Sequence, residues 1–161
     1  TEAQKESLDQ DMAHFADVTE TTLNCAYKNY PGAGAAGGLG FAFLSYLHAS
    51  LSPGVELILD AINLSDALND ADIVVTGEGQ LDRQTAMGKA PVGVAKLAKA
   101  HGAKVLAFSG SVTKEAVACN QAGIDAFFPI LRRIVTLEEA MEPSTARSNM
   151  TASVEQVFRL L

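Results

Sequence analysis

The spacing of apolar positions predicts helices in the first third of the chain. Apolar residues three or four positions apart indicate an amphipathic helix over about residues 3–23 with one buried stripe, formed by Leu8, Met12, Phe15 and Ala16. A glycine-rich loop covers about residues 27–38. The nearly all-round apolar run over about residues 39–51 then predicts a deeply buried helix. Ser52 as N-cap and Pro53 at the first helical position predict another helix that continues to about residue 62.

From residue 71 onward the pattern changes to a regular alternation of short apolar runs and helical periods. It predicts strands over residues 73–76, 105–109 and 126–129, and helices over residues 91–100 and 113–122. Gly102 and Gly123 occupy the C-cap positions of the two helices. This βαβαβ order with short connections predicts a parallel sheet of the α/β class. Two more helices follow, one capped by Thr136 and Glu139 and a final one with an apolar face that includes Val154 and Phe158.

Three strands make a thin sheet for an independent domain, and residues 1–62 predict helices without a sheet of their own. The chain therefore reads as a helical piece of one domain, residues 1–62, joined to half of an α/β domain, residues 63–161.

Composition and charge exclude several classes of function. The 161 residues carry a formal charge of -7, so no basic surface is expected and nucleic acid is not an expected partner. Cys25 and Cys119 stand far apart without a CxxC pair, which signals neither a zinc site nor a disulfide framework and suits a reducing compartment. The longest apolar run is too short to span a membrane and the amino terminus is polar, so we expect a cytoplasmic location and no membrane association.

Charged and hydroxyl side chains are concentrated in the expected loop after the first strand. Among its glycines stand Glu78, Asp82, Arg83, Thr85 and Lys89. Loops at the carboxyl ends of parallel strands face the ligand crevice, so this cluster is a candidate site. A solvated loop that merely carries charge is the alternative.

Each charged residue of this loop has a chemical and a structural interpretation. Glu78 and Asp82 are oxygen ligands of the kind that Mg²⁺ takes, or one of them could accept the proton of an attacking hydroxyl. Alternatively, either carboxylate stabilises the loop by accepting backbone hydrogen bonds. Lys89 precedes the helix that Pro91 opens, so its ammonium and the helix end would converge on a phosphate. Walker-type binding is excluded, because Arg83 replaces the required glycine and Ala90 replaces the hydroxyl residue.

Two further segments are weaker candidates. Residues 32–37 match GxGxxG, but Tyr27 to Pro31 do not form the apolar strand that a dinucleotide site requires. These glycines either permit close packing or leave backbone NH groups free for an anion. Ser109 follows the second strand, which would place its hydroxyl beside the first loop.

Five collinear segments together resemble the carboxyl-terminal part of a bacterial class I glycerate kinase. They are PGAGAAGGLG over residues 31–40, PGVELILD over 53–60, VVTGEGQLDRQT over 74–85, GKAPVGVA over 88–95 and AGIDA over 122–126. The third and fourth segments carry the patterns TGEGxxDxQT and GKxPxGVA, which are specific to that family. Its FKGS-like and DGGEGT-like stretches do not occur in this chain.

The resemblance implies ATP-dependent phosphorylation of D-glycerate, typically at the 2-hydroxyl, with Mg²⁺ as cofactor. It implies two α/β domains: one Rossmann-like or flavodoxin-like, formed from both ends of the polypeptide, and one inserted in its middle. Residues 1–62 would then be the carboxyl-terminal part of the inserted domain, and residues 63–161 the carboxyl-terminal half of the Rossmann-like domain. The missing amino-terminal part would be a partner, the chain alone would be inactive, and exposed apolar surface would favour a homo-oligomer.

The family motifs place the expected site residues at particular positions of this chain. Asp82, Glu78 and Lys89 are the catalytic candidates, with Glu78 and Asp82 also as metal ligands. The candidates for binding substrate or phosphate are Gly77, Gly79, Thr85, Gly34, Gly37, Gly38 and Ser109. Two other functions remain open: an NAD-dependent oxidoreductase, which needs a strand before Gly32, and a non-catalytic ligand-binding α/β module.

Overall fold

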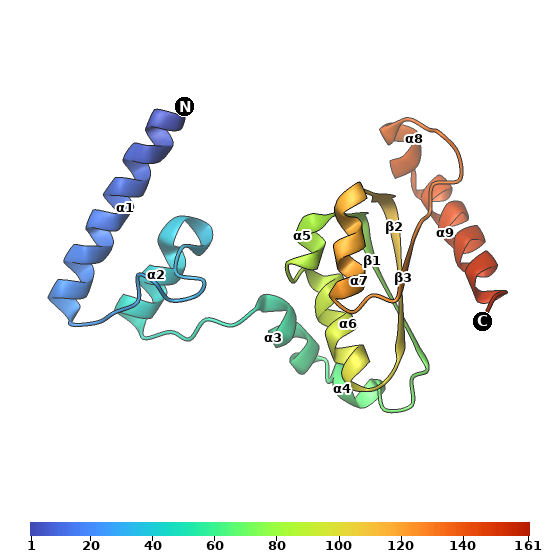
Figure 1. Cartoon of the computed structure of the whole chain (residues 1–161), viewed down its shortest axis with the longest axis horizontal. Coiled ribbons are helices and arrows are strands. Elements are labelled where there is room, and N and C mark those ends of the chain that lie inside the picture. The colour runs from blue at the N-terminus through green and yellow to red at the C-terminus, as the bar shows by residue number, and fades with distance from the viewer. The chain divides into compact units, whose positions relative to one another are not determined.

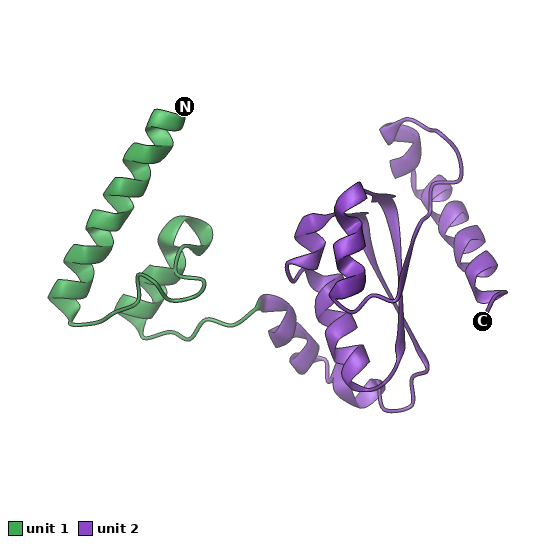
Figure 2. Ribbon diagram, viewed as in Figure 1, with its two compact units in different colours: residues 1–53 green, residues 54–161 purple.

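The computed structural model describes residues 1–161. The chain forms two compact units, residues 1–53 and residues 54–161, each with its own internal contacts (Figure 2). The first unit holds helices α1, Glu2–Leu23, and α2, Ala35–Leu47 (Figure 1). Helix α1 begins at Thr1, whose side chain forms a capping box with Gln4, and it confirms the helix predicted from the apolar spacing. A small core unites the two helices and comprises Ala16, Ala33, Phe41 and Leu44.

The glycine-rich entry to α2 is a tight, left-handed turn. Ala36, Gly37 and Gly38 have φ of 51°, 68° and 91°, so the regular part of the helix begins after them. A Cβ at Gly40 would lie 2.3 Å from the carbonyl oxygen of Gly32, so only glycine fits where the loop meets this helix.

Two expectations for this helix are wrong. It ends at Leu47 instead of about residue 51, because His48 adopts a left-handed conformation. It is also not deeply buried, since Leu39 and Leu47 are 48% and 67% exposed. Within this unit the helix packs on α1 through Phe41, Leu44 and Tyr46, whereas Leu39, Phe43 and Leu47 are largely exposed.

The unit boundary lies between Pro53 and Gly54, earlier than the division expected after residue 62. Helix α3, Gly54–Ala61, packs on the later helix α6, Ala90–Ala100. A Cβ at Gly93 of α6 would lie 2.4 Å from Val55 Cγ2, so the absence of a side chain permits this close contact. The short helix α4, Leu64–Ala67, follows before the first strand.

Three parallel strands form the sheet of the second unit. Strands β1, Ile73–Leu81, β2, Lys104–Val112, and β3, Ala126–Pro129, lie in the order β1-β2-β3. This arrangement confirms the α/β class and the parallel sheet. The first two strands are longer than predicted, because β1 continues to pair with β2 through its glycines: Gly77 lies opposite Phe108 and Glu78 opposite Ser109. We had expected residues 77–79 to form a loop, and this expectation is wrong: they belong to the strand.

Helices cover both faces of this sheet (Figure 1). Helices α5, Arg83–Ala86, α6 and α7, Ala118–Gln121, lie on one face, where the main core includes Leu81, Val92, Ala95 and Val105. The helix predicted over residues 113–122 is a 3-10 turn, Lys114–Val117, followed by α7. On the other face Val154 and Val157 of α9, Pro143–Phe158, pack against Leu106 and Phe108. Helix α8, Leu137–Met141, precedes α9. None of the helices combines the length and the apolar character that a membrane span requires.

Candidate functional site

The structure brings Glu78, Asp82, Thr85 and Lys89 together at the carboxyl end of β1. Glu78 lies on the strand itself, Asp82 follows its last residue, and Lys89 immediately precedes α6. The strand ends at Leu81, whose side chain is completely buried in the core, and the polypeptide then turns into α5. The buried side chain of Leu81 thus fixes the backbone between Glu78 and Asp82.

Thr85 connects the two carboxylates. Its hydroxyl donates a hydrogen bond to Glu78 Oε1 and accepts one from the backbone NH of Asp82 at 3.1 Å. The backbone NH of Thr85 donates to Asp82 Oδ1 at 3.0 Å, which makes Asp82 the N-cap of α5. The structural interpretation of Asp82, a carboxylate that accepts a backbone hydrogen bond, is therefore observed.

The same geometry keeps Asp82 ionised. The backbone NH of Thr85 is the main cause that lowers the pKa of the Asp82 carboxyl below its ordinary value, and the charge of Lys89 acts in the same direction. Lys89 Nζ lies 3.8 Å from Asp82 Oδ1, with the two side chains 41% and 27% exposed. An ion pair so open to water contributes little to stability and leaves both charges accessible to a ligand.

Lys89 also occupies the N-cap position of α6, without a side-chain capping bond. An α-helix leaves its first backbone NH groups unpaired and carries a partial positive charge at this end. The backbone of Lys89 therefore lies at the helix end, and its ammonium lies beside Asp82. This is an arrangement that attracts phosphate.

The neighbouring candidates differ in their access to a ligand. A Cβ at Gly77 would lie 2.1 Å from the carbonyl oxygen of Phe108, so Gly77 is required by strand packing. A Cβ at Gly79 would meet no atom within 4 Å, so there is open space in the direction of a side chain. Ser109 is 1% exposed and its hydroxyl donates to the carbonyl of Ser111 at 2.6 Å. Of these three residues, Gly77 and Gly79 are exposed and Ser109 is buried.

Sequence reasoning missed the contact of Cys119 with the site. Its Sγ lies 3.8 Å from the carbonyl oxygen of Asp82, to which the thiol donates, and its side chain is completely buried. Burial is the first cause that raises the pKa of the Cys119 thiol, followed by the charges of Glu78 and Asp82. The thiol therefore supports the turn in its neutral form. No sequence motif links positions 82 and 119, so this contact could not be predicted.

The two carboxylates can contribute to a Mg²⁺ site, although the chain offers no group of three or more His, Cys, Asp or Glu side chains that could hold a metal. Protein Mg²⁺ sites commonly use one or two carboxylates together with water and substrate phosphates. Glu78 and Asp82 share the hydroxyl of Thr85, since Asp82 Oδ1 lies 3.3 Å from it. This donor set fits a magnesium–phosphate complex better than a metal held by protein ligands alone.

The glycine-rich loop forms a separate candidate surface in the first unit. Gly34, Gly37 and Gly38 line a pocket of about 390 Å³ together with Lys28, Asn29 and apolar residues of α1 and α2. Lys28 Nζ lies 2.5 Å from Asp17 Oδ1 in an ion pair whose side chains are about half exposed. Residues 28–31 form turns and not a strand, which removes the context that a dinucleotide fingerprint requires. The expectation of an NAD-dependent oxidoreductase is therefore wrong.

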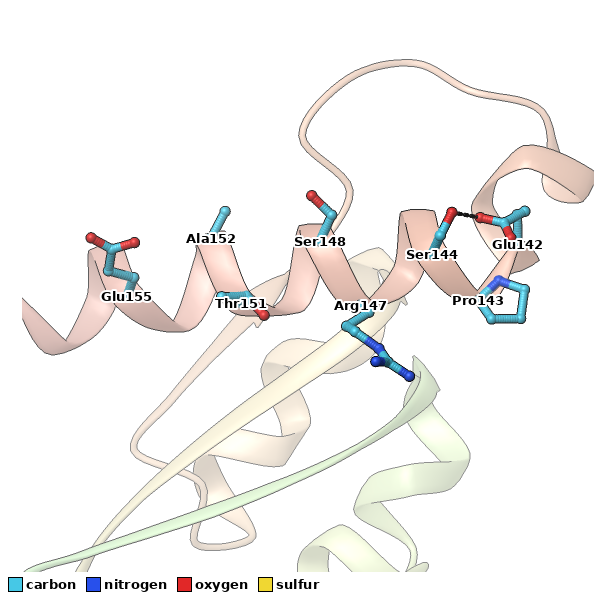
Figure 3. Close-up of a pocket in the computed structure, with 8 residues that line it drawn as sticks. All are labelled: Glu142, Pro143, Ser144, Arg147, Ser148, Thr151, Ala152 and Glu155. Atoms are coloured by element: carbon cyan, nitrogen blue, oxygen red, sulfur yellow. Dashed lines mark hydrogen bonds between the residues drawn. The ribbon is translucent and has the colours of Figure 1, made fainter.

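A larger hollow, about 680 Å³, follows the first turns of α9 (Figure 3). Glu142 caps this helix by accepting from the backbone NH of Thr145 at 2.8 Å. Figure 3 shows Arg147 pointing to the opposite side of the helix from Ser148. None of the residues predicted for the site lines this hollow, and we assign it no chemistry.

Comparisons with known proteins find relatives that match most of this chain. The glycerate kinase family model matches residues 1–161. The "Glycerate kinase" of Bacillus subtilis is 44% identical over 90% of this chain and 38% of its own length. The "Glycerate 2-kinase" of Escherichia coli is 42% identical over 87% of this chain and 37% of its own length.

The crystal structure of a "putative glycerate kinase 2" from Salmonella typhimurium LT2 matches with a TM-score of 0.68 at 35% identity. The match covers 100% of this chain and 42% of that one. This chain thus spans less than half the length of the relatives it matches. The match over the whole chain and the identities above show that the chain belongs to the glycerate kinase family.

Proposed function

We propose that the full-length protein transfers the γ-phosphoryl group of ATP to D-glycerate and forms 2-phosphoglycerate. The observation that carries this proposal is the cluster of Glu78, Asp82 and Lys89 at the carboxyl end of a parallel strand, in a chain of the glycerate kinase family. The name of the Escherichia coli relative supports the 2-hydroxyl as acceptor. A supply of ATP places the reaction in the cytoplasm.

The residues of the cluster suit the parts of a phosphoryl transfer. Such a reaction is catalysed mainly by positioning and by charge stabilisation. Glu78 and Asp82 would hold Mg²⁺, which neutralises phosphate charge when bound, or one of them would accept the hydroxyl proton of glycerate. Lys89 and the first NH groups of α6 would bind a phosphate, and the backbone of Gly79 would bind nearby.

The domain assignment is also a proposal. We assign residues 1–53 to the inserted domain and residues 54–161 to the Rossmann-like domain, with the boundary moved to the observed division between the units. The glycines of the first unit, Gly34, Gly37 and Gly38, would offer backbone NH groups to the substrates.

The test is a coupled ADP-release assay on the full-length protein with D-glycerate, ATP and Mg²⁺. We expect turnover that depends on D-glycerate and disappears when Mg²⁺ is chelated, with ³¹P NMR showing phosphate on the 2-oxygen. L-glycerate and a reaction without acceptor are the controls. Binding of a small acid without any ADP release would instead support a non-catalytic module and overturn the proposal.

A further inference from the structure

Thr85 cannot contact a ligand in the way the sequence suggested. The residue is 0% exposed and lies between Glu78 and Asp82. A threonine hydroxyl has one hydrogen to donate; Glu78 Oε1 is its nearer acceptor, and Asp82 Oδ1 lies farther away at 3.3 Å. The hydroxyl oxygen of Thr85 accepts from the backbone NH of Asp82. The hydroxyl is thus occupied as donor and as acceptor, and no path from solvent reaches it.

We propose that Thr85 is a positioning residue, which holds the Glu78 carboxylate in a fixed orientation beside Asp82 and does not bind substrate or phosphate. The kinetic part of this inference rests on the proposed function. Glu78 lies on a rigid strand, but its side chain has three rotatable bonds, and Thr85 supplies the hydrogen bond to its carboxylate. Thr85 itself is held in place by Asp82, because its backbone NH donates a hydrogen bond to Asp82 Oδ1.

Removal of the hydroxyl should loosen Glu78 while the Asp82 carboxylate still caps α5. Valine has nearly the shape of threonine and keeps the backbone NH that binds Asp82 Oδ1, but it can neither donate to Glu78 nor accept from the backbone NH of Asp82. A catalytic group displaced by about 1 Å can lose about 10²-fold in rate. We therefore expect Thr85→Val to lower kcat by about 10- to 100-fold, while KM for ATP and for D-glycerate change less than about twofold.

The experiment compares Thr85→Val with Thr85→Ser in the full-length protein and combines Thr85→Val with Glu78→Ala. Thr85→Ser keeps the hydroxyl and should retain most of kcat. Because Thr85 acts through Glu78, the double variant should lose no more activity than Glu78→Ala alone. A rise in KM with unchanged kcat, or fully additive losses, would show direct ligand contact and overturn the inference.

A second measurement separates this inference from the proposed function. Wild type, Thr85→Val, Glu78→Ala and the double variant also form a double-mutant cycle for unfolding by urea, which needs no substrate. Coupling between positions 78 and 85 supports the contact even if the wild type has no glycerate kinase activity. If Thr85→Val does not fold, a crystal structure of the wild type with Mg²⁺ and a non-hydrolysable ATP analogue decides: a hydroxyl bound to Glu78 supports the inference, and one bound to the analogue refutes it.

Discussion

Asp82 combines an observed structural role with a proposed chemical one. Its carboxylate accepts the backbone NH of Thr85 at the start of α5 and lies 3.8 Å from the Lys89 ammonium. Asparagine is as good an N-cap as aspartate, but it carries no charge for a metal and is a poor base. The two roles can therefore be separated by one substitution.

For Asp82→Asn in the full-length protein, we expect kcat to fall by about 10²-fold or more, with little change in the urea midpoint of unfolding. Steady-state kinetics and equilibrium unfolding of the same sample provide the measurement. Wild-type turnover in this variant would exclude Asp82 from the mechanism.

Lys89 is expected to act on phosphate. Lys89→Ala should raise KM for ATP or lower kcat, because the positive charge at the start of α6 is lost. The matched control is Lys96→Ala, which removes an exposed ammonium from the same helix. Equal kinetics of the two variants over a range of ATP concentrations would contradict the role of Lys89.

Asp125 gives a prediction about pH that does not involve the site. Its carboxylate accepts from Lys99 Nζ at 2.9 Å and from the backbone NH of Val105 at 2.7 Å, and Lys99 is the first cause that lowers its pKa below the ordinary value of 3.8. A lowered folded-state pKa means that the carboxylate stabilises the fold above its unfolded-state pKa and that this stabilisation is lost as pH falls through the folded-state pKa.

Unfolding of the full-length protein and of Asp125→Asn should be compared between about pH 3 and pH 7. We expect a constant stability difference at the neutral end that shrinks below the ordinary aspartate pKa. The difference will be modest, since both side chains of the ion pair are partly exposed. A difference that grows on acidification would refute this assignment.

At the scale of elements, the two glycines of β1 have different reasons to be glycine. A Cβ at Gly77 would collide with the carbonyl oxygen of Phe108 at 2.1 Å, which is backbone of the neighbouring strand and cannot move aside easily. A Cβ at Gly79 would meet open space. The first glycine permits close strand packing, and at the second a side chain would have room.

Gly77→Ala should therefore destabilise the full-length protein by about 1–3 kcal/mol or more, as overpacking of a closely packed site does. Gly79→Ala is the matched control and should change stability by much less. Urea unfolding of both variants tests the difference. Equal stabilities would mean that β1 and β2 can separate locally without cost.

At the scale of the whole molecule, this chain leaves much apolar surface without a partner. Leu8 is 62% exposed and Leu47 is 67% exposed, and β1 pairs with a neighbour, β2, along one edge only. Exposed apolar patches and unpaired strand edges favour association. In its relatives, the matched segment is about 38% of the protein.

We predict that residues 1–161, purified without other polypeptide, show no glycerate kinase activity and self-associate. A site that must hold ATP and glycerate in line needs groups from both sides of a cleft. ADP release and light scattering on the same sample test this, with the full-length protein as positive control. Robust turnover by a strictly monomeric chain would refute the prediction.

The sequence by itself determined the order of helices and strands and the chemistry available after the first strand. Helical periods and cap residues are local signals, so α1 and α6 were predicted to within a few residues. The order of the polar residues 78, 82, 85 and 89 along the chain also placed them at one end of the sheet.

Tertiary structure decided what these residues contact. Pairing with β2 extended β1 through Gly77 and Glu78, whose types do not favour strands, because interstrand hydrogen bonds depend on a neighbour distant in sequence. Thr85 and Ser109, which the sequence predicted as binding residues, are buried, and their hydroxyls donate to acceptors within the chain. Contacts between distant elements also placed α3 with the second unit and left α2 partly exposed. Such effects follow from packing in three dimensions, which the local pattern of one sequence does not specify.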